Sequence, residues 1–178
     1  LELELGRGRG RRVRLGHLPP MNVWVSWRVG PDDVGVVAFN AFLDPGRVMP
    51  VISEAVAAFV DEGVEGVVID LRGNPGGIGA MAMGISGWFL DDRGLELGTM
   101  RTREADLAFV VFPRPVTYPG PLAILVDGLS ASTAEILAGG LKDLGRARVV
   151  GSHTACEELR GESDERSESN TYEIQSTS

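Results

Sequence analysis

Three hydroxyl residues, Ser130, Ser132 and Thr133, lie between a short apolar stretch and a segment with helical spacing of its apolar residues. Glu135 follows Ser132 by three positions, which is the capping-box pattern typical of a helix start. This pattern favours a capping role for Ser132. It is also compatible with catalysis, because a serine at a helix start lies beside N–H groups that can stabilise an oxyanion. The motif alone leaves both roles open.

A nucleophilic serine needs a base to accept its proton, and the sequence offers few candidates. Lys142 is the only lysine, and it follows Ser132 by ten residues on the same predicted helix, about 15 Å away along the axis. An imidazole can serve as a base near neutral pH, which makes His153 a candidate, although loop histidines are more often simply solvated. Glu157 is a weaker candidate. The sequence has no G-x-S-x-G elbow and so does not indicate an α/β-hydrolase triad.

A second candidate loop, DLRGNPGGIG, follows an apolar stretch that ends at Leu71. Its glycines allow backbone N–H groups to approach a ligand oxygen, and the helix start that follows adds partial positive charge. The loop lacks the G-x-G-x-x-G dinucleotide pattern and the Gly-Lys-Ser/Thr ending of a nucleotide-binding P-loop. An anion-binding nest and a plain structural turn are the two interpretations that remain. Asp70 and Arg72, which flank the strand end, are expected to be structural partners.

Apolar stretches alternate with helical patterns along most of the chain. Strands are predicted at residues 34–42, 66–71, 122–126 and 147–151, with weaker ones at 95–103 and 107–112. Helices are predicted at residues 44–63, 78–90 and 132–144. Apolar strands that alternate with helices predict an α/β fold, in which a mixed or parallel sheet is covered by helices. LELEL and RRVRL around GRGRG predict a hairpin at the beginning of the chain.

Composition excludes several classes of function. The net charge is −8, whereas a nucleic-acid surface needs clustered Lys and Arg, so no nucleic-acid partner is expected. The single cysteine, Cys156, excludes an internal disulfide, and the two histidines lie far apart, which gives no support for a zinc site. No apolar run reaches the roughly 20 residues that span a bilayer. The chain starts at Leu1 within a strand pattern, so we expect it to be part of a longer protein.

The two loops together resemble a known family. GVVIDLRGNPGG, followed by PLAILVDGLSASTAEILAGGLKDLGRARVVG, is similar to the carboxyl-terminal processing (tail-specific) serine proteases, over residues 34–154. The resemblance implies a ClpP/crotonase-like α/β core and a serine-type peptidase that hydrolyses unstructured segments, often near a protein's C-terminus. It also implies a protein or peptide substrate, no metal or organic cofactor, and an extracytoplasmic location. It leaves the oligomeric state open.

The same resemblance assigns roles to individual residues. It places Ser132 as the acyl nucleophile and the backbone N–H groups of Gly77 and Thr133 as the oxyanion hole. Glu135 is expected to cap the helix or to orient the Ser132 loop. His153 is the candidate for a supporting residue.

The resemblance also divides the chain into segments. Residues 1–18 look like the final hairpin of a PDZ-like peptide-binding module, and residues 19–33 look like a linker that leads into the core. Residues 34–155 correspond to the protease-like core, expected to be incomplete at its C-terminal end. Residues 156–178 are rich in Glu and Ser and poor in apolar residues, which is the composition of a disordered tail.

The expected base is the point of departure from the family pattern. After VVG the family reads E-x-T-x-G-K-G, with the lysine as base, whereas this sequence has Cys156 for the glycine and Glu157 for the lysine. The departure favours an alternative, a non-catalytic member that binds an apolar ligand or a peptide, as retinoid-binding relatives of these proteases do. A crotonase-type acyl-coenzyme A enzyme would share the amide oxyanion hole, but S-A-S-T-A-E resembles a serine-protease signature. The base stays unassigned.

Overall fold

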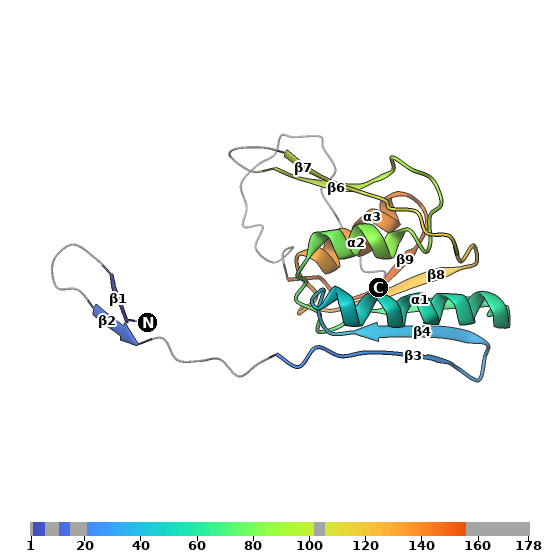
Figure 1. The fold of residues 1–178 in the computed structure, drawn as a ribbon, viewed down its shortest axis with the longest axis horizontal. Helices are drawn as coiled ribbons and strands as arrows, with labels where there is room; N and C mark the ends of the chain where they lie inside the picture. The colour runs from blue at the N-terminus through green and yellow to red at the C-terminus, as the bar shows by residue number, and fades with distance from the viewer. Residues whose placement is uncertain (1, 6–10, 15–20, 102–105, 156–178) are drawn as a thin grey trace.

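The computed structural model describes residues 2–5, 11–14, 21–101 and 106–155. Its main sheet contains five strands, in the order β3 (Val25–Val29), β4 (Val34–Phe39), β5 (Gly66–Asp70), β8 (Leu122–Val126) and β9 (Arg148–Gly151). β3 and β4 pair antiparallel, and the other neighbours pair parallel (Figure 1). The sheet is therefore mixed, as the apolar strands predict.

Two further pairs of strands are antiparallel. They are β1 (Glu2–Leu5) with β2 (Arg11–Arg14), and β6 (Glu96–Arg101) with β7 (Asp106–Val110). The first pair is the hairpin expected at the beginning of the chain. Its origin in a PDZ-like module stays a prediction.

Strand β3 lies within residues 19–33, which were assigned from the sequence to a linker and the entry to the core, with no strand predicted there. Val25, Trp27 and Val29 alternate with more exposed residues, and Trp27 lies opposite Val37 of β4. Trp27 also packs edge-on against the Phe59 ring, with centroids 5.7 Å apart. This packing makes the segment an edge strand of the core, and its period of two was the overlooked signal.

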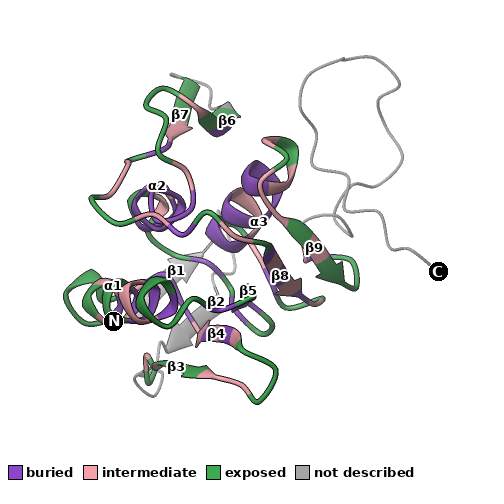
Figure 2. Ribbon diagram, turned by 90° about the vertical axis from the view of Figure 1, so that its right-hand side faces the viewer, coloured by how far each residue is buried: buried purple, intermediate pink, exposed green. Residues whose placement is uncertain are grey.

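Helices α1 (Pro45–Glu62), α2 (Gly79–Ser86) and α3 (Thr133–Asp143) cover one face of the main sheet (Figure 2). α1 begins with proline in its first turn and ends at Gly63, whose left-handed φ of 65° lets its N–H return to the carbonyls of Phe59 and Val60. The helix predicted at 78–90 is shorter than expected, since α2 ends at Ser86. α1 packs against β3 and β4 and α3 against β9, whereas α2 packs against α1, α3 and β7.

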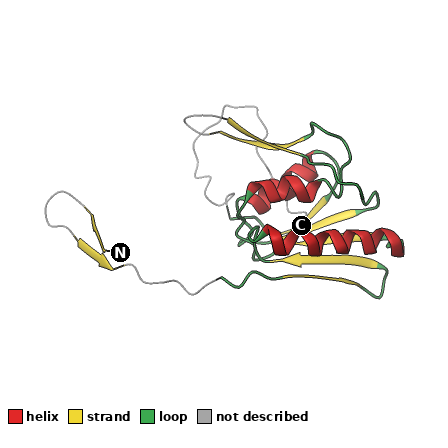
Figure 3. Ribbon diagram, in the orientation of Figure 1, coloured by secondary structure: helices red, strands yellow, loops and turns green. Residues whose placement is uncertain are grey.

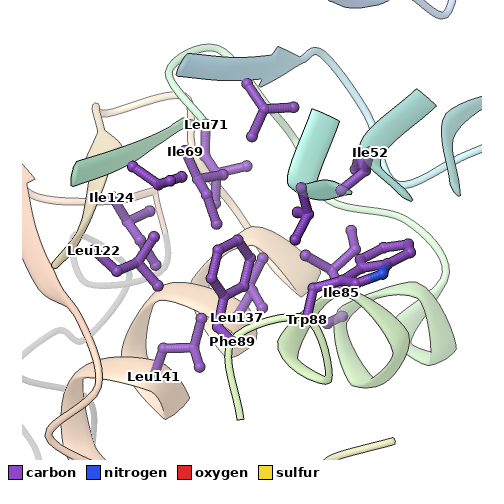
Figure 4. Packing of buried hydrophobic residues seen from close by; sticks show 14 of the residues in the cluster. Ile52, Ile69, Leu71, Ile85, Trp88, Phe89, Leu122, Ile124, Leu137 and Leu141 are labelled. Carbon is purple, nitrogen blue, oxygen red and sulfur yellow. The ribbon is translucent and has the colours of Figure 1, made fainter. Parts of the chain in front are cut away.

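The core is the layer between these helices and the sheet. Side chains from the central strands point into it, among them Ile69 of β5 and Ile124 of β8, which are register partners and fully buried. Figure 4 shows them packed against Leu137 and Leu141 of α3 and Ile85 of α2. Because these side chains are buried, they hold the central strands in place, and the loops that follow the strands start from fixed positions.

Candidate active site

Three loops meet at the carboxyl ends of the parallel strands, where sites in α/β sheets commonly form. They follow β4, β5 and β8 and comprise residues 40–44, 71–78 and 127–132 (Figure 3). The Phe42 N–H donates to the Gly76 carbonyl oxygen at 2.9 Å, and the Ala131 N–H donates to the Asn74 carbonyl oxygen at 3.0 Å. The Gly-rich loop is therefore bonded to both of the others.

Ser132 is exposed and immediately precedes the first residue of α3. Its φ of 54° and ψ of −116° lie in a region that glycine adopts freely and other residues rarely adopt. Holding a serine there costs about 1–3 kcal/mol, and such strain is typical of functional sites. The serine thus stands exposed at a sharp turn between β8 and α3.

Ser132 and Glu135 form the capping box that the sequence predicts. The Ser132 N–H donates to Glu135 Oε2 at 2.5 Å, and the Ser132 side chain faces the Glu135 N–H to complete the box. The Glu135 N–H also donates to the Ser132 carbonyl oxygen at 2.9 Å, as a backbone turn bond. Within the described part of the chain, the Ser132 hydroxyl donates to no other residue. The cap therefore leaves the hydroxyl proton without an acceptor among these residues, so capping and nucleophilic roles remain compatible.

Gly76 and Gly77 bring the backbone of the Gly-rich loop against the Ser132 turn. A Cβ on Gly76 would lie 2.8 Å from the Thr133 nitrogen and 2.6 Å from the Ala131 carbonyl oxygen, and the φ of Gly76 is 90°. Only glycine allows this approach. The Thr133 hydroxyl donates to the Gly77 carbonyl oxygen at 2.8 Å, which joins the two loops a second time.

The N–H groups of Gly77 and Thr133 donate to no acceptor within residues 21–101 and 106–155. Gly77 is exposed, and the Thr133 N–H lies at the start of α3, where the helix dipole is positive. Two backbone donors beside an exposed serine are what an oxyanion requires. The structure thus brings together Ser132, Thr133 and Gly77, the three residues that the sequence analysis singled out.

Asn74 is fully buried, and its side chain forms hydrogen bonds that hold the Gly-rich loop in place. Its Nδ2 donates to the Phe39 carbonyl oxygen at 2.9 Å, and its Oδ1 accepts the Gly76 N–H at 2.9 Å. One side chain thus ties the end of β4 to the glycine that approaches Ser132. Asn74 was not predicted from the sequence to have a role, although an amide between glycines at a strand end is a usable signal.

Asp127 and Ser130 connect the Gly-rich loop with the Ser132 loop. The buried Ser130 hydroxyl donates to the Leu71 carbonyl oxygen at 2.8 Å, and Asp127 Oδ1 accepts the N–H groups of Gly73 at 2.9 Å and Leu129 at 3.0 Å. Burial acts to raise the pKa of Asp127, but these hydrogen bonds outweigh it and lower the pKa. Because its hydroxyl is buried and bonded to the Leu71 carbonyl oxygen, Ser130 has a structural role rather than a nucleophilic one.

Other candidates from the sequence are His153, the pair Asp70 and Arg72, and the two residues Cys156 and Glu157. His153 is exposed in the loop after β9, and its carbonyl oxygen lies near Gly128. Arg72 donates two hydrogen bonds to the Asp70 carboxylate, at 2.9 and 2.7 Å, and thereby lowers the pKa of Asp70. The two are structural partners, as expected. Cys156 and Glu157 lie outside the described residues.

Two features are absent from the part of the chain that the structure describes. No group of three or more His, Cys, Asp or Glu side chains there is arranged to hold a metal ion. None of the helices there combines the length and apolar character needed to cross a bilayer.

Comparison with known proteins supports the sequence resemblance. The model of peptidase family S41 matches residues 33–170, well over half of the chain. A carboxyl-terminal-processing protease of Picosynechococcus sp. is 32% identical over 123 residues, which cover 69% of this chain and 29% of that protein. The chloroplastic carboxyl-terminal-processing peptidase 3 of Arabidopsis thaliana is 36% identical over 104 residues, which cover 58% of this chain and 20% of that protein. The chain spans less than a third of the length of either relative.

Solved structures share the fold of the core. A photosystem II D1 C-terminal processing protease aligns with a TM-score of 0.63 at 23% identity, covering 83% of this chain and 41% of that one. A protein from Parabacteroides merdae aligns with a TM-score of 0.63 at 19% identity, covering 76% of this chain and 45% of that one. These alignments confirm the predicted α/β class. Taken with the family match over residues 33–170, they complete the assignment: the chain belongs to peptidase family S41.

Proposed function

We propose that this chain is the core of a serine endopeptidase that cleaves peptide bonds in unstructured or C-terminal segments of proteins. One observation carries the proposal: Ser132 is exposed in a strained, glycine-like conformation beside the unengaged N–H groups of Gly77 and Thr133. Family membership supports a protein or peptide as substrate. The mechanism requires no metal or organic cofactor.

The chemistry would follow an acyl-enzyme route. Ser132 Oγ attacks the carbonyl carbon of the scissile peptide while a base takes its proton, and the carbonyl oxygen becomes an oxyanion held by the two N–H groups. The base returns the proton to the leaving amine, which leaves an ester on Ser132. Water, activated by the same base, then hydrolyses this ester to a carboxylic acid and free serine. The positive end of α3 would favour the oxyanion in both steps.

No described residue accepts the Ser132 hydroxyl proton, so the base of this route stays unassigned, with His153 and Glu157 as candidates. The Ala155 N–H donates to the Ser130 carbonyl oxygen at 3.0 Å, so the chain leaves the described region beside the Ser132 loop. The resemblance places the family's lysine at position 157, two residues beyond Ala155, where this chain has Glu157. Residue 157 lies outside the residues that the structure describes.

A second function, binding an apolar ligand or a peptide without cleavage, is favoured by one specific observation. Glu157 stands where the resemblance expects the lysine, and no described residue accepts the Ser132 hydroxyl proton. In that case the two N–H groups would hold a carbonyl or carboxylate oxygen of a bound peptide rather than a transition state. Both functions use the same loops and differ only in proton transfer.

Cleavage of an unstructured polypeptide, followed by mass spectrometry, separates the two functions. We expect the family segment to be restored by the triple substitution Cys156→Gly, Glu157→Lys and Glu158→Gly, and this variant should cleave while its Ser132→Ala derivative should not. Cleavage by the unaltered chain as well would mean that another base serves Ser132, with His153→Ala as the next variant. Peptide binding without cleavage by either folded form would contradict the protease and support the binding function.

A further inference from the structure

Thr154 is a buried polar residue that the route described above does not use. Only 2% of its surface is exposed, and it lies just beyond β9, at the end of the described chain. Its hydroxyl donates to Glu135 Oε1 at 2.6 Å, across 19 positions of sequence. An O–H group bonded to a carboxylate at this distance is in the short, charge-assisted range.

The other oxygen of the same carboxylate reaches the nucleophile. Glu135 Oε2 accepts the Ser132 N–H at 2.5 Å, so one carboxylate joins Thr154 to the backbone of Ser132. The direction of that N–H is set by the unusual φ of Ser132, 54°. A carboxylate that holds this N–H therefore holds the strained conformation itself.

A backbone contact fixes the same segment to the same loop. The Ala155 N–H donates to the Ser130 carbonyl oxygen at 3.0 Å, two residues before Ser132. Thr154 and Ala155 thus hold the Ser132 loop at two points, one through Glu135 and one directly. Without the Thr154 hydroxyl, the Glu135 carboxylate would lose one of the hydrogen bonds that fix its orientation, which weakens its hold on the Ser132 N–H.

We propose that Thr154 is a positioning residue for Ser132, acting through Glu135 to hold the nucleophile in its left-handed conformation. The catalytic meaning of this link rests on the proposed function, whereas the conformational link does not. Thr154 and Ala155 precede position 157, where the resemblance places the base, and Cys156 lies between.

Hydrogen exchange of the Ser132 amide, measured by NMR on the full chain, tests the link without any need for activity. In the wild-type chain, the Ser132 amide should exchange slowly although the residue is exposed, whereas the unengaged amide of exposed Gly77 should exchange fast. Fast exchange at Ser132 in the wild type would overturn the proposal. This comparison needs no variant and so does not depend on a substituted chain folding.

Substitution sharpens the test. Thr154→Val removes the hydroxyl and keeps the side-chain shape, and should speed Ser132 exchange about tenfold or more, as loss of a hydrogen bond to a charged group allows. Amides of β8 should be unaffected, and Thr154→Ser should resemble the wild type. Thr99→Val, at an exposed threonine of β6, is the matched control. Exchange that stays unchanged in Thr154→Val, or that rises equally in β8, would refute a specific link.

A functional readout distinguishes failure of this link from failure of the proposed function. In whichever form of the chain reacts with a fluorophosphonate, Thr154→Val should slow the labelling step about tenfold, and Thr154→Ser should restore it. If no form reacts while the exchange results hold, the peptidase fails and the positioning role stands. If a form reacts equally fast with Thr154→Val, the positioning role is wrong and the peptidase stands.

Discussion

Ser132→Gly should give a more stable fold than Ser132→Ala. The φ of 54° and ψ of −116° at Ser132 are strained for any residue with a Cβ and unstrained for glycine. Neither replacement has a hydroxyl, so both lose the same side-chain capping contribution. Their difference in stability therefore reports the backbone strain at the proposed nucleophile, reduced by the greater freedom of glycine in the unfolded chain.

The expected difference follows from two opposing terms. Relief of the strain is worth about 1–3 kcal/mol, and the greater freedom of glycine in the unfolded chain returns about 0.4–1 kcal/mol. The two ranges leave about 0–2.6 kcal/mol in favour of glycine, with a midpoint of about 1.3 kcal/mol. For a chain of 178 residues the midpoint corresponds to a Tm difference of about 3–5 °C.

Urea and thermal denaturation of the two variants measure this difference directly. Ser53, an exposed residue within α1, supplies the matched control, since glycine should there be less stable than alanine by about 1 kcal/mol. The sign of the effect should thus reverse between the two positions. If Ser132→Gly is no more stable than Ser132→Ala, the strained conformation is not present in solution. The interpretation of that strain as the mark of a functional site is then wrong.

Two further predictions concern the loops around Ser132. In urea denaturation, Gly76→Ala should destabilise the fold clearly more than Gly73→Ala. Both glycines have positive φ, but only at Gly76 would a Cβ meet the backbone of Ala131 and Thr133. Equal losses of stability would contradict the close approach at Gly76. Asp127→Asn should reduce stability at neutral pH and flatten its dependence on acid. The folded state lowers the pKa of Asp127, so its carboxylate stabilises the fold above the unfolded pKa of about 3.9 and loses that contribution as pH falls through the folded pKa. Denaturation from pH 7 to pH 2 should show the wild type and the variant converging at low pH, and a constant gap would refute the assignment.

Local sequence patterns predicted most of the elements of the core. Apolar runs such as LAILV and GVVID identified β8 and β5, and the proline and glycine that bound α1 identified that helix. The capping pattern located the start of α3 at Ser132. These features are encoded within a few neighbouring residues, and so a pattern can detect them.

The supporting contacts of the site could not be predicted in the same way. Asn74 bonds to Phe39, Ser130 to Leu71, and Thr154 to Glu135, and each of these pairs is far apart in sequence. Such partners become neighbours only once the parallel strands are in register. Ser132, Thr133 and Gly77 were found earlier because the family resemblance, rather than spacing, connected the two loops.

The most direct test of the central claim is labelling of the full chain with a fluorophosphonate, followed by proteolysis and mass spectrometry of the peptide that contains Ser132. We expect a mass shift on Ser132 in the chain whose family segment is restored by Cys156→Gly, Glu157→Lys and Glu158→Gly. The shift should be absent when Ser132→Ala is added. Labelling confined to another residue, or no labelling of a sample shown to be folded, would contradict the claim that Ser132 is the nucleophile of this fold.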